Sequence, residues 1–446
     1  MTEYDLGIIG YGAAGFAAAI RASELTYNGM KIALIGHGDI GGTCVNRGCV
    51  PSKYLIEASK QLFSSKNPLY PGIKSSAEIN FNELMSSLRN FVSKAREEKY
   101  INVIKNFGNI DIYKGKAHFV SKNEVMVNSE KIKATNFIIA TGSRPYIPEN
   151  IDNYVTSDDI WSIDELPRKL AIIGSGAVAM EMAYAFSNLG SEVYVFNRSD
   201  HVLKNFDNDI SRLLIEHMKN LGVKFIFGDI NKADDDYVIS DKKYDGFDKI
   251  LVATSRVPNI DINLDAASVN YRHGIIVDDH LRTSNKMIYA AGDCVEQRLQ
   301  LETLAGREGV TAVENILGFD KSIDFRSIPW VVFTEPNVAS VGLTENQLKD
   351  YKKRVIELKN VVKSSILMQD GIVKMLTDKN GTVLGVQAFA PYAAEFIAEA
   401  ASVIRKQGSY NDFIETMHVF PTVSESIKIT AQSFIRDISK MSCCME

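Results

Sequence analysis

Two cysteines in a glycine-rich segment are the residues of this chain best suited to chemistry. Cys44 and Cys49 lie five positions apart within Gly41–Lys53. Thiolates exchange electrons and bind soft metals, so a close pair can serve either purpose. On a regular helix this spacing turns two side chains roughly 140° apart and separates them by about 7.5 Å along the axis. The pair could therefore form a disulfide only in a distorted helix, which Gly48 and Pro51 allow.

A dinucleotide-binding pattern precedes the cysteines. A buried strand predicted at 4–9 is followed by Gly10, Gly12 and Gly15, and then by an alanine-rich helix predicted at 16–24. Such glycines permit a tight turn and let the backbone approach a pyrophosphate at the helix N-terminus. Cysteines beside a cofactor site indicate electron transfer between a dinucleotide and sulfur. The alternative is a pair of buried structural cysteines.

The strand predicted at 31–35 lacks the acidic residue that normally ends it. That acid binds the ribose hydroxyls of the dinucleotide, and Gly36 stands in its place. We therefore expect a backbone group or another side chain to make the ribose contact.

The pattern occurs a second time, in a strand and helix that begin at Leu170. Gly174 and Gly176 form the turn, and Ala179 replaces the third glycine, which the pattern permits. Two nucleotide-binding patterns in one chain imply two nucleotides. This argues against a simple NAD-dependent dehydrogenase.

Two cations follow the second strand of this repeat, predicted at 192–196. The strand ends without a carboxylate, and Arg198 and Lys204 come next. Cations at this place neutralise a 2′-phosphate, so NADPH is favoured over NADH. The alternative is a solvated surface pair.

Composition limits the remaining classes of function. The 446 residues suggest two to four domains, and a net charge of −5 argues against non-specific nucleic-acid binding. No run of eighteen apolar residues occurs, so we expect no membrane span. The N-terminus carries no signal-peptide pattern, and five cysteines make no secreted disulfide framework. We therefore expect a cytoplasmic protein.

The segment Gly41–Lys53 resembles, nearly residue for residue, the redox-active disulfide motif of the pyridine nucleotide–disulfide oxidoreductases. Two further motifs of that family are Phe137–Pro145, with its Ala-Thr-Gly turn, and Lys286–Cys294. The resemblance implies FAD as a cofactor beside NADPH. The positions expected to contact FAD are Gly10, Gly12, Gly15, Gly42, Thr43, Thr141, Gly142 and Asp293.

The same resemblance assigns roles to the reactive residues. It implies a redox-active disulfide in which Cys49 lies nearer the flavin and Cys44 exchanges with substrate. It also implies an ion pair between Lys53 and Glu181 near the flavin, where a cation can tune the flavin's electronics.

The predicted fold class is α/β, with two Rossmann-like dinucleotide-binding domains and an α+β C-terminal dimerisation domain. The expected boundaries are 1–148 for the first part of the FAD-binding domain, 149–268 for the NADPH-binding domain, 269–323 for the second FAD part and 324–446 for the interface domain. The resemblance implies a homodimer in which each active site borrows residues from the partner's C-terminus.

The C-terminal motif departs from the family pattern. Phe420 stands where the family has a catalytic histidine, whereas the accompanying glutamate, Glu425, remains. A phenylalanine cannot transfer protons, so the usual acid–base reduction of a disulfide is disfavoured. Glu425 has an equally good structural interpretation, a capping box with Thr422. His418 is expected to be a packing or surface residue.

The chain ends with two adjacent cysteines, Cys443 and Cys444, after an amphipathic helix predicted to run from 427 to 441. Consecutive Cα atoms lie about 3.8 Å apart, closer than the usual 5.5 Å or so of a disulfide. The pair is better suited to bind a soft metal as a dithiolate. The alternative is an idle tail.

Phe420 together with the cysteine tail is similar to members of the family that reduce mercuric ion. Tyr154 matches a tyrosine of their mercury site, whereas Thr422 stands where better-known members have a second tyrosine. This resemblance implies NADPH-dependent reduction of thiol-bound Hg(II) to Hg(0). The partner's Cys443 and Cys444 would pass the metal to the cysteine pair of Gly41–Lys53.

Two other functions compete with this one. One is an FAD-dependent reductase of a low-molecular-weight disulfide, against which Phe420 counts. The other is sequestration of soft metal ions without redox chemistry, against which two complete nucleotide motifs count.

Overall fold

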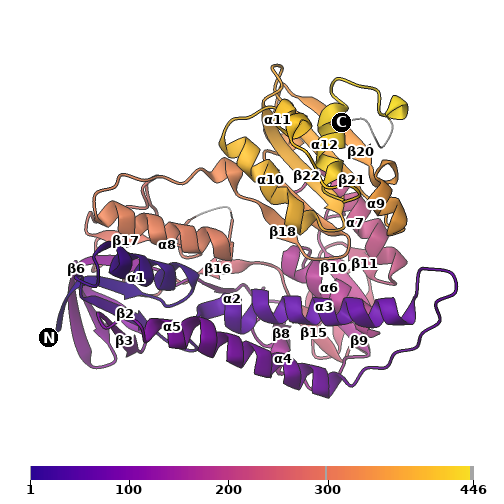
Figure 1. The fold of residues 1–446 in the computed structure, drawn as a ribbon. Helices are drawn as coiled ribbons and strands as arrows, with labels where there is room; N and C mark the ends of the chain where they lie inside the picture. The colour runs from indigo at the N-terminus through magenta and orange to yellow at the C-terminus, as the bar shows by residue number, and fades with distance from the viewer. Residues whose placement is uncertain (1, 297–298, 442–446) are drawn as a thin grey trace.

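The computed structural model describes residues 2–296 and 299–441, and its chain is arranged around three main sheets (Figure 1). The first sheet has seven strands in the order β3-β2-β1-β6-β5-β4, and β17 pairs with β6. The strands are β1 (Thr2–Ile9), β2 (Ile32–Gly36), β3 (Ile110–Lys114), β4 (Ala117–Ser121), β5 (Glu124–Val127), β6 (Glu130–Ile139) and β17 (Ile288–Ala290). Strand β17 follows the second unit in the sequence. The first unit is therefore formed by two segments of the chain, one before and one after the second unit.

Helices α1 (Ala13–Leu25) and α8 (Glu302–Ile316) pack against each other on this sheet. Small residues allow the contact, because a Cβ on Gly309 would lie 2.1 Å from the carbonyl oxygen of Ala14. The N-terminal ends of both helices are thereby held in place beside the first glycine turn.

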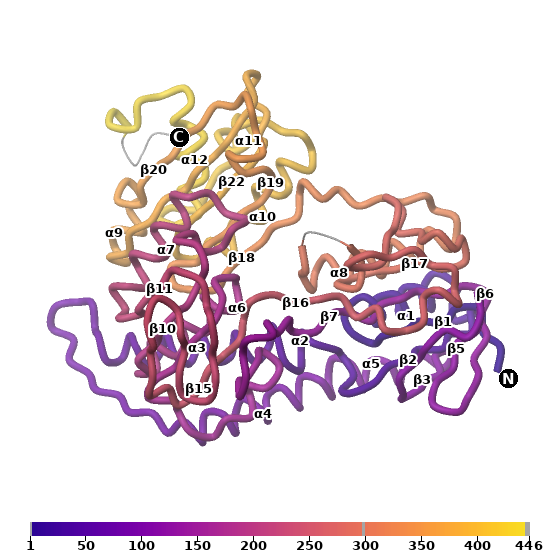
Figure 2. Tube along the Cα trace, turned by 180° about the vertical axis from the view of Figure 1, so that it is seen from behind, coloured from indigo at the N-terminus to yellow at the C-terminus, as the bar shows by residue number. Residues whose placement is uncertain are grey.

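The second unit contains a parallel sheet in the order β11-β10-β9-β15-β8. Its strands are β8 (Val155–Thr156), β9 (Lys169–Ile173), β10 (Glu192–Asn197), β11 (Lys224–Phe227) and β15 (Lys249–Val252), and its helices are α6 (Ala177–Leu189) and α7 (Asn208–Asn220). A small sheet adds β12 (Lys232–Asp234), β13 (Tyr237–Ile239) and β14 (Lys243–Tyr244). The ribbon of β7 (Ser143–Pro145) and β16 (Arg256–Pro258) lies between the two units (Figure 2).

The C-terminal unit is an antiparallel sheet in the order β18-β19-β22-β21-β20 with helices beside it (Figure 1). Its strands are β18 (Trp330–Val332), β19 (Asn337–Gly342), β20 (Lys352–Glu357), β21 (Ile372–Thr377) and β22 (Val383–Ala390). Its helices are α9 (Val362–Ile366), α10 (Ala393–Arg405), α11 (Tyr410–Glu415) and α12 (Glu425–Gln432). The predicted fold class is therefore confirmed.

A helical layer connects the first two units. It consists of α2 (Gly42–Arg47), α3 (Cys49–Lys66), α4 (Phe81–Arg96) and α5 (Asn102–Ile104), with a π-helical turn at Glu97–Ile101. The apolar side of α3, including Leu55 and Ile56, shares one buried core with Met182 and Phe186 of α6. Because of this packing, the first turn of α3 lies against the second nucleotide-binding unit.

The predicted final helix was wrong beyond residue 432. Helix α12 ends at Gln432, and only a short 3₁₀ turn forms at Ile438–Lys440. Just beyond this end, Arg354, which is remote in sequence, donates from Nε to the carbonyl oxygen of Ser433 at 2.8 Å. The Asp437 carboxylate then accepts from the backbone N–H of Ser439 and starts the new turn. Among the described residues, no helix is long and apolar enough to cross a bilayer.

A buried cation joins the second unit to the C-terminal sheet. The Lys374 side chain on β21 is inaccessible to solvent, and its ammonium contacts Asp207 Oδ2 at 2.7 Å, Asp209 Oδ1 at 2.6 Å and Glu345 Oε1 at 2.9 Å. Burial opposes ionisation of Glu345, but hydrogen bonds from Lys353 and Lys374 outweigh it and lower the pKa of Glu345 to about 2. The two units are thus held together by charge as well as by apolar contact.

We predict that Lys374→Met strongly destabilises the protein, because the buried Asp207 and its neighbours lose their counter-charge. Breaking a buried ion pair on one side costs about 3–5 kcal/mol, which thermal unfolding followed by circular dichroism should detect as a lower midpoint. Lys353→Met is the matched control, since Lys353 also contacts Glu345 but its side chain is 43% exposed. Its effect should stay below about 1 kcal/mol. Equal shifts in the two variants would show that the buried ion pairs of Lys374 contribute no more than an exposed one.

Candidate active site

The cysteine pair lies at a break between two helices. Cys44 is in α2 and Cys49 is the first residue of α3, and Gly48 between them has φ −122° and ψ −106°. A Cβ on Gly48 would lie 3.1 Å from the carbonyl oxygen of Thr43, so the turn is tight. The distortion that the spacing required is therefore present, and it brings two free thiols close enough to shift each other's pKa.

The two sulfurs have unequal acidity. The hydrogen bond from Cys44 lowers the pKa of Cys49, and the charge of Lys53 lowers it further, against the opposing effect of burial. The hydrogen bond to Cys49, followed by burial, raises the pKa of Cys44. Of the two thiols of the reduced pair, Cys49 is therefore the one that loses its proton first.

Lys53 and Glu181 form the ion pair that the sequence predicted to lie near the flavin. The Lys53 ammonium lies 2.9 Å from Glu181 Oε2 and 3.0 Å from Oε1. Glu181 is buried in α6, and its Oε1 also accepts from the backbone N–H of Phe333 at 3.0 Å. The ammonium lies 4.5 Å from the centre of the Phe333 ring. Three separate segments thus fix the cation that acts on Cys49.

A cavity of about 470 Å³ opens at the first glycine turn. Gly10 has φ +119°, and a Cβ there would lie 2.0 Å from the carbonyl oxygen of Ala140. A Cβ on Gly42 would lie 2.6 Å from the Cα of Gly12, so the two backbones touch. The predicted FAD positions that line the cavity are Gly10, Gly12, Gly42, Thr43, Thr141 and Gly142. Bare backbone at the start of α1 suits a pyrophosphate, so the cavity fits FAD.

Two predicted FAD positions do not line this cavity. Gly15 lies inside α1, where a Cβ would be 1.9 Å from the carbonyl oxygen of Gly10. The absence of a side chain at position 15 therefore allows α1 to pack against the glycine turn. Asp293 accepts from the Ser143 hydroxyl at 2.8 Å, and Ser143 does line the cavity. Burial raises the pKa of Asp293 against the lowering effects of Ser143 and Arg256.

The second glycine turn repeats this geometry. Gly174 has φ +122°, and a Cβ there would lie 2.3 Å from the carbonyl oxygen of Ala253. Apart from its chain neighbours and the nearby helix backbone, no described atom lies within 4 Å of the place a Cβ on Gly176 would take, which leaves room at the start of α6. Arg198 and Lys204 lie exposed beyond β10, and neither pairs with a carboxylate among the described residues. The turn is thus open and flanked by cations.

The structure does not bring every predicted residue to the cysteines. Tyr154 lies just before β8 with 38% of its surface exposed, and in the described part of the chain it makes no hydrogen bond or ring contact with the pair. Glu425 accepts from the backbone N–H of Thr422 at 3.0 Å, which is one half of a capping box. Cys443 and Cys444 lie outside the described residues.

The segment around the missing histidine is exposed and apolar. Phe420 is 52% exposed, and Met417 and Val419 beside it are more so. His418 is not a free surface residue: its Nε2 lies 3.1 Å from Glu399 Oε2, and this hydrogen bond raises the pKa of the imidazole. The one histidine of this segment is thus engaged within its own unit.

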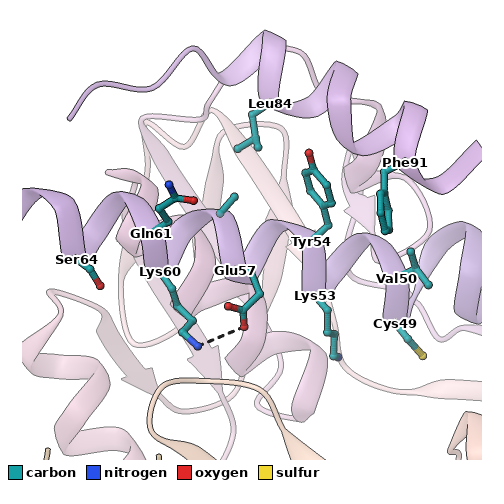
Figure 3. A pocket seen from close by; sticks show the side chains of 11 residues that line it. Cys49, Val50, Lys53, Tyr54, Glu57, Lys60, Gln61, Ser64, Leu84 and Phe91 are labelled. Carbon is teal, nitrogen blue, oxygen red and sulfur yellow. Dashed lines mark hydrogen bonds and ion pairs between the residues drawn. The ribbon is translucent and has the colours of Figure 1, made fainter. Parts of the chain in front are cut away.

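A groove of about 970 Å³ runs along α3 and ends at Cys49 (Figure 3). Helix α4 forms its other wall, where the Phe91 ring lies 5.3 Å from that of Tyr54. Lys60 in the groove contacts Glu57 at 3.3 Å and Glu335 at 3.0 Å. The lining residues are Cys49, Val50, Lys53, Tyr54, Glu57, Ala58, Lys60, Gln61, Ser64, Leu84 and Phe91.

Comparison with known proteins identifies the family of this arrangement. Residues 4–309 match the family model described as pyridine nucleotide-disulphide oxidoreductase, and residues 328–431 match the dimerisation domain of the same family. The chain belongs to this family. It is therefore an oxidoreductase, and membership implies FAD and a nicotinamide dinucleotide.

The chain is also similar to individual proteins of known name. A mercuric reductase of Lysinibacillus sphaericus is 38% identical over 99% of this chain and 84% of its own length. A mercuric reductase of Staphylococcus aureus is 35% identical with the same coverage. Among solved structures, the Cu(II) complex of the HOCl-induced flavoprotein disulfide reductase RclA from Escherichia coli aligns with a TM-score of 0.86 over 98% of this chain and all of its own, at 23% identity.

Two residues near the thiols of this oxidoreductase escaped the sequence analysis. Tyr100 lies in the π-helical turn, 4.8 Å from the Phe16 ring, and burial followed by the charge of Cys44 raises its pKa to about 12. Glu302 begins α8, and its charge opposes ionisation of both cysteines. Neither belongs to a local motif, and only the fold brings them to the site.

We predict that Lys53→Met raises the pKa of Cys49, because the thiolate loses the nearest cation. In the reduced enzyme, the rate at which iodoacetamide alkylates Cys49 at neutral pH should fall, and its pH profile should move to higher pH. Mass spectrometry of the peptide that contains Cys49 measures this rate separately from the other cysteines. Lys60→Met is the matched control, since Lys60 lies in the same groove but is not among the charges that shift the pKa of Cys49. An unchanged profile for Lys53→Met would refute the role of this cation.

Proposed function

We propose that this protein is a homodimeric, NADPH-dependent mercuric reductase that converts thiol-bound Hg(II) to Hg(0). The observation that carries the proposal is the Cys44–Cys49 pair, held at a groove with an acidic Cys49, in a chain with Phe420 at the catalytic histidine position. The names of the relatives at 38% and 35% identity support the choice of metal. The match to the dimerisation domain supports the homodimer.

The balance of the reaction is simple. NADPH, one proton and a bis-thiolate complex of Hg(II) give NADP⁺, Hg(0) and two thiols. FAD, when bound, supplies two-electron transfer between the nicotinamide and the cysteine pair. Residues of the cavity at Gly12 and Gly42 would hold its pyrophosphate, and Asp293 would hold the ribityl chain.

The residues of the chain divide the metal chemistry between them. Cys49 offers a thiolate, which is the form that binds Hg(II), and the Lys53 charge maintains it. Cys44 becomes the second ligand when it releases its proton. Cys443 and Cys444 of the partner subunit are proposed to collect the metal from thiols in solution and to pass it inward by exchange of thiolate ligands. Tyr154 is proposed to lie beside the metal once the dimer has formed.

The decisive experiment compares substrates for one protein sample. FAD-loaded enzyme is given NADPH with Hg(II) as a bis-thiol complex, with glutathione disulfide, or with lipoamide. NADPH oxidation with Hg(II) alone, together with release of volatile mercury, is the expected result. Oxidation with a disulfide and inhibition by Hg(II) would instead identify a thiol-disulfide reductase that mercury poisons.

We predict that the double variant Cys443→Ala, Cys444→Ala turns over thiol-bound Hg(II) more slowly, because delivery of the metal is lost. Reduction of the flavin by NADPH should remain as fast as in the unaltered enzyme, since the tail takes no part in hydride transfer. Stopped-flow absorbance measures flavin reduction, and trapping of mercury vapour measures turnover. Cys294→Ala serves as the control, because Cys294 is buried and bonds backbone carbonyls. Unchanged mercury turnover in the double variant would exclude the relay.

We predict that Arg198→Gln with Lys204→Gln raises KM for NADPH about tenfold or more, because each cation forms a charge-assisted hydrogen bond with the 2′-phosphate. KM for NADH should change little. Steady-state kinetics with both dinucleotides measure the ratio. Lys219→Gln, at the far end of α7, is a control for loss of surface charge. A parallel rise for NADPH and NADH would argue against 2′-phosphate recognition.

The alternative is reduction of a low-molecular-weight disulfide. It is favoured by the pairing of His418 with Glu399, an imidazole–carboxylate pair two residues from Phe420. The substrate comparison described above separates the two functions.

A further inference from the structure

The strand that normally carries the ribose-binding acid cannot carry one in this chain. A Cβ on Gly36, at the end of β2, would lie 2.3 Å from Cδ1 and 2.4 Å from Cε1 of Tyr11. Such distances are far below van der Waals contact, and Tyr11 is only 4% exposed. The Tyr11 ring therefore fills the space in which a side chain at position 36 would begin.

Tyr11 also organises the loop that follows the strand. Its hydroxyl donates to the carbonyl oxygen of Gly38 at 2.7 Å, and its own carbonyl accepts from the N–H of Gly41 at 3.0 Å. The loop thus wraps around the ring, and residues 37–39 face the cavity. The tyrosine lies within the first glycine turn, between Gly10 and Gly12, so Gly36, which replaces the acid, is in contact with that turn.

The loop carries a carboxylate of its own. Asp39 lies three residues beyond Gly36 and lines the same cavity as the glycine turn. Its Oδ1 lies 3.1 Å from Arg96 Nη1 on α4, which fixes the side chain while 54% of it stays exposed. Its charge contributes to the raised pKa of Tyr11, after burial, so the carboxylate lies near the tyrosine ring.

The other polar residues in this part of the cavity are poorly suited to accept hydrogen bonds from two ribose hydroxyls. Lys116 is a cation. The pKa of His37 is lowered by burial and then by the charges of Lys116 and Arg47. Cations suit a pyrophosphate, whereas a carboxylate accepts from two ribose hydroxyls at once. Two other carboxylates line the cavity. Asp158 pairs with Arg256 at 3.0 Å, and Asp261 is 80% exposed and pairs with Arg144 at 3.3 Å.

We propose that Asp39 binds the hydroxyls of the adenosine ribose of FAD, and that Tyr11 and Gly36 are a matched pair that displaced the acid from the strand to the loop. The inference rests on FAD as the cofactor of the proposed function. A protein that binds no flavin would overturn that function itself, whereas flavin binding without ribose recognition by Asp39 overturns only this inference.

The first test measures binding, not activity. Flavin-free protein is titrated with FAD and with an FAD analogue that lacks both hydroxyls of the adenosine ribose, and quenching of flavin fluorescence gives each Kd. The unaltered protein should bind FAD about tenfold or more tightly than the analogue, because charge-assisted hydrogen bonds are lost with the hydroxyls. Asp39→Asn should bind both flavins nearly equally.

Two further variants make this result specific. Asp164→Asn is the matched control, because Asp164 is a similarly exposed carboxylate that pairs with another arginine of α4, Arg89, at 2.9 Å. It should discriminate between the flavins as the unaltered protein does. Asp261→Asn examines the more exposed of the two rival carboxylates of the cavity. Loss of discrimination in Asp261→Asn, or its retention in Asp39→Asn, would overturn the proposal.

The matched pair is tested by exchange. Gly36→Glu alone should weaken FAD binding severely, because the new side chain collides with Tyr11. Adding Tyr11→Gly should restore binding, and in that double variant Asp39→Asn should no longer alter discrimination, since the acid is back on the strand. Tight binding by Gly36→Glu alone would show that Tyr11 does not exclude a side chain at position 36.

Discussion

The contact between the backbones of Gly12 and Gly42 is the constraint on which the rest of the site depends. A Cβ on Gly42 would lie 2.6 Å from the Cα of Gly12. With a larger residue at position 42, the starts of α1 and α2 could not come this close. This contact places the N-terminus of α2, two residues before Cys44, against the turn that opens the dinucleotide cavity. The contact between these two glycines therefore places the cysteine pair beside the cofactor cavity.

The break at Gly48 and the ion pair of Lys53 complete the arrangement. A regular helix would separate two side chains at this spacing, whereas the break lets the two thiols shift each other's pKa. The ion pair then anchors α3 to Glu181 of the second nucleotide-binding unit, where burial limits screening by solvent. One lysine thus fixes the position of a helix and stabilises the charge of the thiolate on it.

The parts of the site that could be predicted from the sequence are those whose residues belong to local motifs. The glycine turns, the cysteine spacing and the strands around them follow from spacing and residue type, and Lys53 with Glu181 followed from family resemblance. Tyr100 and Glu302 could not be found, because only the packing of distant segments brings them to the thiols. The end of the last helix at Gln432 was missed as well, and the contact just beyond it comes from Arg354, a residue of β20 that is far away in the sequence. The place of Tyr154 at the metal site stays a prediction.

The departures from the family pattern bear on the substrate. Reduction of a disulfide makes a leaving thiolate that must be protonated near the cysteines, and a histidine at position 420 would serve that step. A mercury atom leaves without a proton, and thiolates displaced from Hg(II) in solution are protonated by water. Phe420, which is 52% exposed on the C-terminal unit, therefore hinders the reduction of a disulfide more than the reduction of a metal ion. A Cys49 whose pKa is already lowered by Cys44 and Lys53 needs no imidazole to become a ligand. The loss of the histidine and the lowered pKa of Cys49 together support the proposed reduction of a soft metal ion.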